Sequence, residues 1–245
     1  MFDCTVAGVD CRIEYRDPGV PPRCDGYDVR AVTAAATPVR VRFEGGRVAD
    51  LIRRHPGTVP LIAEWTCIYD QVSRQMLRFD RLTFHGACVE FGGKAYVFTA
   101  YHGTGKSTHI RLWRRYLGDA VRVVNGDKPI ISVADGILAC GTPWCGKEGW
   151  QNNVQVPLAA ICILRRAEGG VHSTIRQATT EESLDELVNR IYLTNDPAQA
   201  TKAMDMLNAI LKAVPVYVLT SDMSEDAVRT SFEGLTGELY ESWKA

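Results

Sequence analysis

The chain has 245 residues, of which 46% are hydrophobic and 23% are charged, and its formal net charge at pH 7 is −1. This length supports a substantial buried core in one large or two modest domains. The near-neutral charge excludes a basic nucleic-acid-binding surface, and no apolar run or N-terminal leader indicates a membrane span. We therefore expect a cytoplasmic protein without a nucleic-acid or membrane partner.

The chain contains eight cysteines, but no two of them form a Cys-x-x-Cys pair. Several lie within apolar runs, which is typical of reduced, buried thiols. Cys140 and Cys145 flank a polar loop without a histidine or a second cysteine pair at ligand spacing, so a zinc site is not expected.

Residues 1–80 are predicted to form a small α+β lobe that is rich in strands at its beginning. Prolines and glycines separate its alternating segments. Strands are expected over residues 5–9, 29–33 and 39–43, and helices over 48–54 and 61–79. This lobe shows little chemistry in its sequence.

Residues 81–245 are predicted to form a second domain, which begins with a strand over 82–90 and a hairpin turn at Gly92 and Gly93. An apolar strand over 95–100 then enters the turn Ala-Tyr-His-Gly-Thr-Gly-Lys-Ser-Thr, which a helix follows up to Leu117. The order of strand, glycine-rich loop and helix is that of a phosphate-binding loop. A glycine-rich turn that ends in Lys-Ser by coincidence is the alternative.

The loop offers the groups that a nucleotide phosphate needs. Gly103 and Gly105 allow backbone N–H groups to approach the phosphate closely. Lys106 can reach the β- and γ-phosphates, Ser107 can bind Mg²⁺, and the N-terminus of the helix favours an anion. ATP and Mg²⁺ are therefore the expected ligands.

A carboxylate is expected near this loop. An apolar strand over 121–125 ends in the sequence Asn125-Gly126-Asp127, and phosphoryl transfer commonly uses an acid in this place to bind the metal or to receive a proton. Asp127 is the candidate, and the alternative is an ordinary Asn-Gly-Asp turn. His85 is expected beside the loop, where a lone strand histidine can also be purely structural.

The segment over residues 141–153 is rich in glycine, tryptophan and polar residues. Its tryptophans, lysine, glutamate and paired asparagines are expected to be exposed, which favours a lid or an acceptor-binding loop over a core element. A structural Ω-loop is the alternative. The candidate acceptor-loop residues are Trp144, Lys147, Glu148, Asn152 and Asn153.

The remaining chain is predicted to alternate between strands and helices. A buried strand over 156–164 ends at Arg165 and Arg166, which either face solvent or reach phosphates. A capping box begins a helix at Thr179, and Asp196 caps a second helix. A strand over 214–219 and a helix over 224–232 complete the domain.

Three separated motifs resemble HPr kinase/phosphorylase and the small HPr-kinase-like or PEP-carboxykinase-like bacterial proteins. They are His85-Gly86 followed by Gly-Thr-Gly-Lys-Ser-Thr-His, then Asn-Gly-Asp-Lys-Pro over 125–129, and Gly-Thr-Pro-Trp-Cys-Gly-Lys-Glu over 141–148. The resemblance spans roughly residues 80 to 220 and implies an α/β fold. It implies a mixed-sheet P-loop domain of the HPr-kinase/PEP-carboxykinase type behind a small N-terminal β-rich lobe.

The resemblance also implies residue roles for an ATP- and Mg²⁺-dependent kinase that phosphorylates a serine-type hydroxyl on a peptide or small protein. Asp127, Lys106 and His85 would be catalytic, and Ser107 and Asp127 would hold the metal. The nucleotide would contact Gly103, Thr104, Gly105, Lys106, Ser107 and Thr108. Because HPr kinase forms hexamers, a homo-oligomer is also implied.

Two positions depart from the family pattern: Tyr101-His102 replaces Pro-Ser, and Gly126 replaces the first acid of an Asp-Asp pair. The second departure leaves open a non-catalytic ATP-binding regulatory module. A small-molecule enzyme of the PEP-carboxykinase type is a third alternative, although the chain is about half the length associated with that family.

Overall fold

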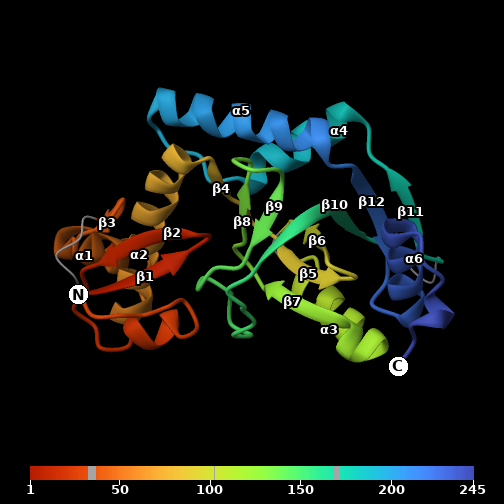
Figure 1. The fold of residues 1–245 in the computed structure, drawn as a ribbon, viewed down its shortest axis with the longest axis horizontal. Coiled ribbons are helices and arrows are strands. Elements are labelled where there is room, and N and C mark those ends of the chain that lie inside the picture. The colour runs from red at the N-terminus through yellow and green to blue at the C-terminus, as the bar shows by residue number, and fades with distance from the viewer. Residues whose placement is uncertain (33–36, 102, 168–171) are drawn as a thin grey trace.

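The computed structural model describes residues 1–32, 37–101, 103–167 and 172–245. The chain forms a mixed α/β structure with its termini at opposite ends (Figure 1). Its strands are β1 (Phe2–Val6), β2 (Val9–Ile13), β3 (Val39–Val41), β4 (Arg81–Thr83), β5 (Ala87–Phe91), β6 (Lys94–Thr99), β7 (Val121–Asn125), β8 (Ile130–Ser132), β9 (Leu138–Cys140), β10 (Gln155–Arg166), β11 (Thr174–Gln177) and β12 (Val216–Ser221). Its α-helices are α1 (Gly45–Arg54), α2 (Pro60–Met76), α3 (Lys106–Leu117), α4 (Thr180–Leu187), α5 (Pro197–Ala213) and α6 (Glu225–Thr236).

The described strands β4 to β12 form one mixed sheet, in which β10 is central. β10 runs parallel to β6 and to β12, and its first residues pair antiparallel with β9. β5 pairs antiparallel with both β6 and β7. The strand before the glycine-rich loop is therefore held between two neighbours in the interior of the sheet.

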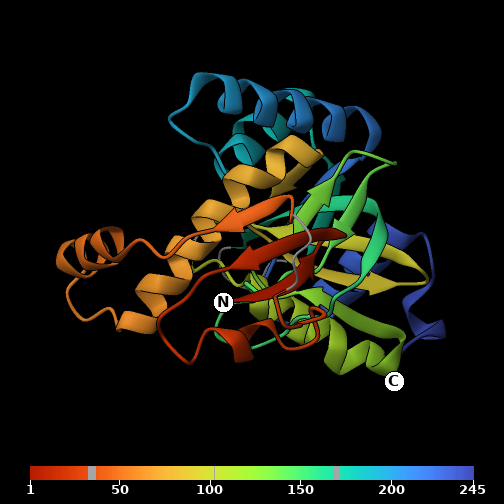
Figure 2. The ribbon, with the colours of Figure 1, turned by 60° about the vertical axis from the view of Figure 1, so that its left-hand side comes forward.

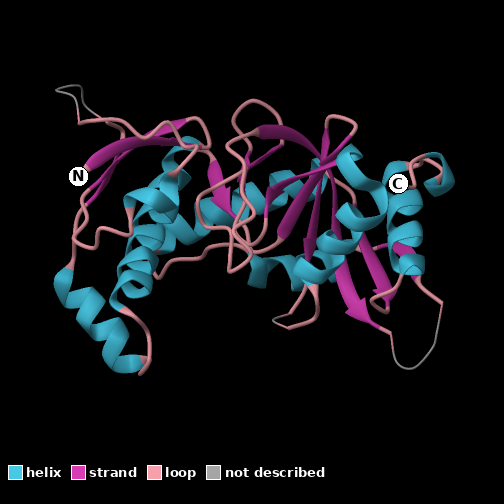
Figure 3. Ribbon diagram, turned by 90° about the horizontal axis from the view of Figure 1, so that it is seen from below, coloured by secondary structure: helices cyan, strands magenta, loops and turns pink. Residues whose placement is uncertain are grey.

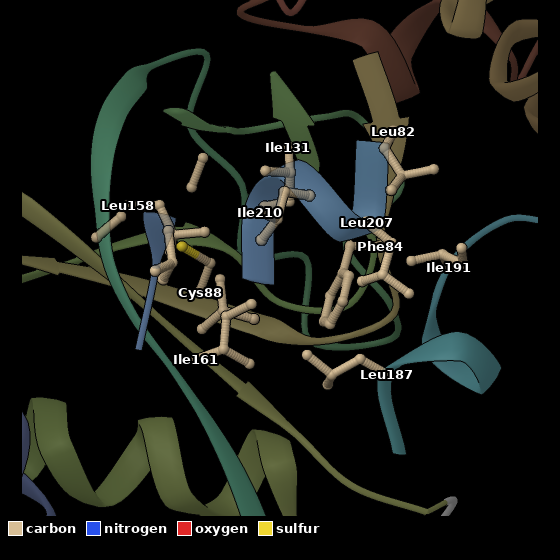
Figure 4. Close-up of a cluster of buried hydrophobic side chains, with 14 of the residues drawn as sticks. Leu82, Phe84, Cys88, Ile131, Leu158, Ile161, Leu187, Ile191, Leu207 and Ile210 are labelled. Atoms are coloured by element: carbon tan, nitrogen blue, oxygen red, sulfur yellow. The ribbon is translucent and has the colours of Figure 1, made fainter. Parts of the chain in front are cut away.

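Helices cover both faces of this sheet, and each face has its own core. On one face α4 and α5 bury Leu187, Leu207 and Ile210 against apolar side chains of the sheet (Figure 4). On the other face α3 and α6 bury Trp113 and Phe232. Burial of such side chains on both faces fixes the position of α3, the helix that follows the glycine-rich loop.

The N-terminal lobe consists of the sheet β1-β2-β3 with α1 and α2 beside it (Figures 1 and 2). α2 buries Trp65, Ile68 and Met76, whereas α1 has no buried residue and extends away from the sheets (Figure 3). The core of the lobe includes Cys140 and Trp144 from the second predicted domain. The two regions thus share apolar packing across residue 80.

The structure confirms most of the predicted elements. The helix expected over 61–79 is α2, the capping box at Thr179 is formed, and the side chain of Asp196 caps α5. The cysteines are free and are buried apart from the partly exposed Cys145. Of the two alternatives for Arg165, the structure shows the solvent-facing one, with an ion pair to Glu182 at 3.4 Å.

Three strand predictions are wrong. The strand expected over 82–90 is two strands, since β4 and β5 are separated at residues 84–86 and lie in different parts of the sheet. The strand expected over 5–9 contains a hairpin turn, with Ala7 at φ 50° and Gly8 at φ 75°. The described part of 29–33 contributes one bridge, between Arg30 and Asp3. Apolar runs alone do not show where a chain leaves one strand partner for another.

Candidate functional site

The glycine-rich loop connects β6 to α3 as the sequence predicts. Gly103 and Gly105 have φ values of 79° and 117°, a region that glycine enters without steric cost. A Cβ atom at Gly105 would lie 2.0 Å from Cε of Met223, so a larger residue would also displace the end of this methionine side chain. The first N–H groups of α3 have no partner within the helix and are available to an anion at its N-terminus. The departure at His102 lies outside the described residues.

Lys106 begins α3, and its ammonium group is buried beside the loop. Its Nζ donates to the carbonyl oxygen of Ala100 at 3.3 Å, and 9% of the residue is exposed. Burial lowers the pKa of Lys106; the charge of Asp127 opposes this shift, and the charges of Arg190 and Lys128 add to it. A bound phosphate would relieve this repulsion between neighbouring cations.

Asp127 lies between His85 and Lys128 at the end of β7. His85 Nε2 lies 3.3 Å from Asp127 Oδ1, and Lys128 Nζ lies 3.0 Å from Oδ2. Burial would raise the pKa of Asp127, but hydrogen bonding and charge from His85 and Lys128 outweigh burial and lower this pKa to about 2. The carboxylate therefore stays ionised, which suits a group that binds a cation or orients a hydroxyl.

Asn125 holds the backbone of this carboxylate in place. Its fully buried side-chain oxygen accepts hydrogen bonds from the backbone N–H groups of Asp127 and Lys128 at 2.9 and 2.7 Å. Its amide nitrogen donates to the carbonyl oxygen of Thr142 at 2.8 Å. The Asn-Gly-Asp sequence is therefore a side-chain-stabilised turn, and this turn also positions Asp127.

His85 occupies the break between β4 and β5. Its backbone N–H donates to the carbonyl oxygen of Arg190 at 2.6 Å, and its carbonyl oxygen accepts from the Thr99 hydroxyl at 2.8 Å. A Cβ atom at Gly86 would lie 2.9 Å from a methyl group of Val97, so the His-Gly pair needs glycine in its second position. The break brings His85 to the start of the glycine-rich loop.

A cavity of about 550 Å³ brings most of the predicted site residues together. The predicted residues that line this cavity are His85, Gly103, Gly105, Lys106, Ser107, Thr108, Asp127, Lys147 and Glu148. Thr104 instead donates its backbone N–H to Tyr101 within the loop, at 3.2 Å. Arg111 also lines the cavity, and its guanidinium lies 3.7 Å from Glu148.

The predicted acceptor loop is divided between two environments. Lys147 is exposed beside the phosphate-loop cavity. Asn152 instead donates to the carbonyl oxygen of Val123 at 2.6 Å and lines a separate hollow, and Asn153 is exposed. The expectation of an exposed Trp144 is wrong, because only 6% of this residue is exposed and its ring stacks on Trp65 at 5.2 Å between centroids.

Gly126 is required by close packing. A Cβ atom there would lie 2.6 Å from the carbonyl oxygen of Cys145, and the backbone N–H of Gly126 donates to the carbonyl oxygen of Trp150 at 2.9 Å. A carboxylate at this position would therefore displace the 141–153 loop. The packing of this chain therefore favours glycine at position 126, where the family pattern has an acid.

Arg190 is a cation of this region that the sequence did not reveal. Its side chain is 7% exposed and its guanidinium lies 4.3 Å from the centroid of the Tyr101 ring. Glu186 is 3.7 Å away, and Nε and Nη2 of Arg190 have no hydrogen-bond partner among the described residues. Arg190 directly precedes an apolar residue at the end of a helical pattern, so its sequence context resembles a surface position.

The comparisons with known proteins give a distant structural likeness. No family model matches the chain, and no curated protein matches it. Among solved structures, the chain is similar to the Hpr(Ser) kinase/phosphatase from Coxiella burnetii, with 12% identity and a TM-score of 0.36. The match covers 65% of this chain and 94% of that chain. No described helix is long and apolar enough to cross a membrane.

The replacement Asp127→Asn tests the electrostatics of the site. Because the pKa of Asp127 is about 2 in the folded chain and ~3.9 for an unfolded aspartate, its ionised form stabilises the fold above pH ~4. This contribution is lost as pH falls through the folded pKa. We expect Asp127→Asn to lower the free energy of unfolding near neutral pH, with a smaller difference from wild type near pH ~3. Denaturant unfolding at both pH values measures this.

The matched control is Asp119→Asn, at an exposed aspartate with no ion pair among the described residues. It should stay close to wild type at both pH values. An equal loss for Asp127→Asn at both pH values would contradict the ion-pair account.

The replacement Gly126→Asp tests the packing of the loop. We expect it to lower the free energy of unfolding by about 1–3 kcal/mol, because a backbone carbonyl must move to admit the new side chain. The control Gly46→Asp adds the same side chain where a Cβ meets no atom within 4 Å, so it should change stability by less than about 0.5 kcal/mol. Equal stability of the two variants in thermal or denaturant unfolding would contradict this prediction, because it would show that the backbone at Cys145 moves without a cost in stability.

Proposed function

We propose that this chain is a P-loop kinase that transfers the γ-phosphate of ATP to a serine-type hydroxyl on a peptide or small protein. The observation that carries the proposal is one cavity lined by the phosphate loop, Lys106, Asp127 and His85, which come from three separate parts of the sequence. Phosphoryl transfer depends mainly on positioning and on compensation of negative charge, and these residues supply both.

The phosphates would lie at the N-terminus of α3. Lys106 and the free N–H groups of the first turn would neutralise and orient the β- and γ-phosphate oxygens. Arg190 would add positive charge from the side of Tyr101. Its unused donors and its effect on the pKa of Lys106 support this placement.

Asp127 would orient the acceptor at the edge of the phosphate cavity. The hydroxyl would donate to its carboxylate while the hydroxyl oxygen forms the new bond to phosphorus and the bond to the leaving ADP oxygen breaks. The hydroxyl proton would pass to solvent, because a carboxylate with a pKa of about 2 holds a proton only weakly. His85 and Lys128 keep this carboxylate ionised and in place.

The donor set also fits a magnesium ion. Ser107 and Asp127 present the oxygen ligands that this cation prefers, and it commonly takes its other ligands from phosphates and water. The described residues contain no group of three histidine, cysteine, aspartate or glutamate side chains arranged to hold a metal. When bound, Mg²⁺ would neutralise phosphate charge.

A second candidate is an ATP-binding module without turnover. The observation that favours it is the packing at Gly126, which leaves no room for the first acid of the family's Asp-Asp pair. A PEP-carboxykinase-like reaction has less support, and ATP consumption that depends on oxaloacetate would indicate it.

Transfer from labelled ATP to serine-containing peptides and small proteins, in the presence of Mg²⁺, tests the kinase proposal. We expect Lys106→Ala and Asp127→Asn each to reduce transfer roughly a hundredfold or more. The first removes positive charge at the reacting phosphate, and the second removes the carboxylate proposed to orient the hydroxyl and to hold the metal. Lys94→Ala, at an exposed lysine of β6, should retain wild-type transfer. ATP binding without transfer to any acceptor would instead support the regulatory module.

A further inference from the structure

A second cavity, of about 680 Å³, adjoins the phosphate-loop cavity. Asp127, Gly146 and Lys147 line both cavities, so the two spaces meet at the carboxylate proposed to orient the acceptor. This volume is within the range of sites that enclose small organic ligands. A hydroxyl that reaches Asp127 from this side faces the phosphate loop.

The walls of this second cavity are aromatic and come from both lobes. Trp65 and Tyr69 belong to α2, and Trp144 belongs to the 141–153 loop. The Trp65 and Trp144 rings are stacked with an angle of 27° between their planes, and the edge of Tyr69 meets Trp144 at 5.7 Å between centroids. Ile62 adds an apolar surface. Such a surface binds a planar or apolar group.

The charged lining of the second cavity is mainly positive. Arg23, Lys128 and Lys147 line it, and Asp127 is the carboxylate among its described lining residues. Lys128 is already paired with Asp127, at 3.0 Å. Within the described chain, the guanidinium of Arg23 has no carboxylate in ion-pair range and lies 5.8 Å from the centroid of the Trp65 ring. An anionic group on a ligand would supply the missing partner.

The backbone of Arg23 is held in place, although its guanidinium has no ion pair among the described residues. Its carbonyl oxygen accepts a hydrogen bond from Gln151 Nε2 at 3.4 Å, which joins the N-terminal lobe to the end of the 141–153 loop. Arg23 lies in the short 3₁₀ turn Pro21–Cys24, and Cys24 anchors this turn in the core of the lobe. The lobe therefore presents a cation at one wall of the cavity while Asp127 lies at another.

We infer that this cavity is the acceptor site and that it takes a hydroxyl-bearing carboxylate with a planar or apolar body. This inference rests on the proposed kinase function. The hydroxyl lies at Asp127, the body lies against Trp65, Tyr69 and Trp144, and the carboxylate pairs with Arg23. The carboxylate belongs either to a free small molecule or to a peptide that carries it beside the serine.

Binding of N-benzoyl-L-serine, compared with its uncharged amide, tests the assignment. Tryptophan fluorescence reports binding because Trp65 and Trp144 line the cavity. We expect the acid to bind roughly tenfold or more tightly than the amide, since the charge-assisted bond to Arg23 is lost in the amide. Arg23→Gln should abolish this preference, and Arg40→Gln, at an exposed arginine of β3, should keep it.

Transfer assays then distinguish the two sources of the carboxylate. The free acid is compared with a peptide in which serine stands between tyrosine and aspartate, each with labelled ATP and Mg²⁺. Phosphorylation of the free acid alone assigns a small-molecule acceptor, and phosphorylation of the peptide alone assigns a peptide acceptor. In either case Arg23→Gln should reduce transfer at low acceptor concentration more than at saturation, as expected for loss of binding.

Equal binding of acid and amide, or equal behaviour of Arg23→Gln and Arg40→Gln, would overturn the acceptor assignment. The rise of melting temperature with ATP provides the separate readout. Arg23→Gln should keep the wild-type rise, because Arg23 does not line the phosphate-loop cavity. No rise in wild type, with the acid preference intact, would reject the kinase function while leaving an anion-selective cavity.

Discussion

The site depends on one carboxylate, that of Asp127, which lies between a histidine and a lysine. His85 and Lys128 lie within 3.3 Å of Asp127, and the charges of Asp127, Arg190 and Lys128 all act on Lys106. Positive charge is thus concentrated where the N-terminus of α3 already favours an anion. A bound anion would reduce the repulsion between these neighbouring cations, and this effect is the physical basis of the proposed function.

The fold makes this concentration of charge possible by fixing three turns beside one another. The glycine-rich loop leaves β6, the Asn125–Lys128 turn leaves β7, and His85 lies in the break before β5. β5 pairs antiparallel with both β6 and β7, so the three segments meet at the same end of these strands. The hydrogen bonds of Asn125 and Thr99 then hold the turns in register. The close-packed cores on the two faces of the sheet hold these strand ends in place.

The sequence was sufficient to predict which residues gather beside the glycine-rich loop but not the way the lobes meet. Glycines, a lysine and a serine between a strand and a helix form a pattern that is recognisable because close approach of the backbone to a phosphate requires these residue types. The structure brings Lys106, Ser107, Asp127 and His85 to one cavity. The burial of Trp144 could not be predicted, because its partner Trp65 is far away in the sequence. Arg23 was missed for the same reason, and Arg190 was missed because its neighbours show an amphipathic helix pattern. Contacts between distant segments are set by tertiary packing, which periodicity does not encode.

The 141–153 loop packs on Gly126, lines both cavities and contacts α2. Its Trp144 ring stacks on Trp65 of α2. The loop therefore connects the proposed phosphate site, the cavity proposed for the acceptor and the N-terminal lobe. The glycine at position 126 and the aromatic wall at Trp144 both belong to the packing of this loop.

The most direct test of the central claim is the melting temperature with ATP, with and without Mg²⁺, for wild type, Lys106→Ala and Asp127→Ala. ATP at about a hundredfold over its dissociation constant should stabilise the chain by roughly 2.7 kcal/mol, or on the order of 5–10 °C. The account predicts a rise that requires Lys106 and that increases with Mg²⁺ only when Asp127 is present. An unchanged melting temperature in the folded wild type would contradict it.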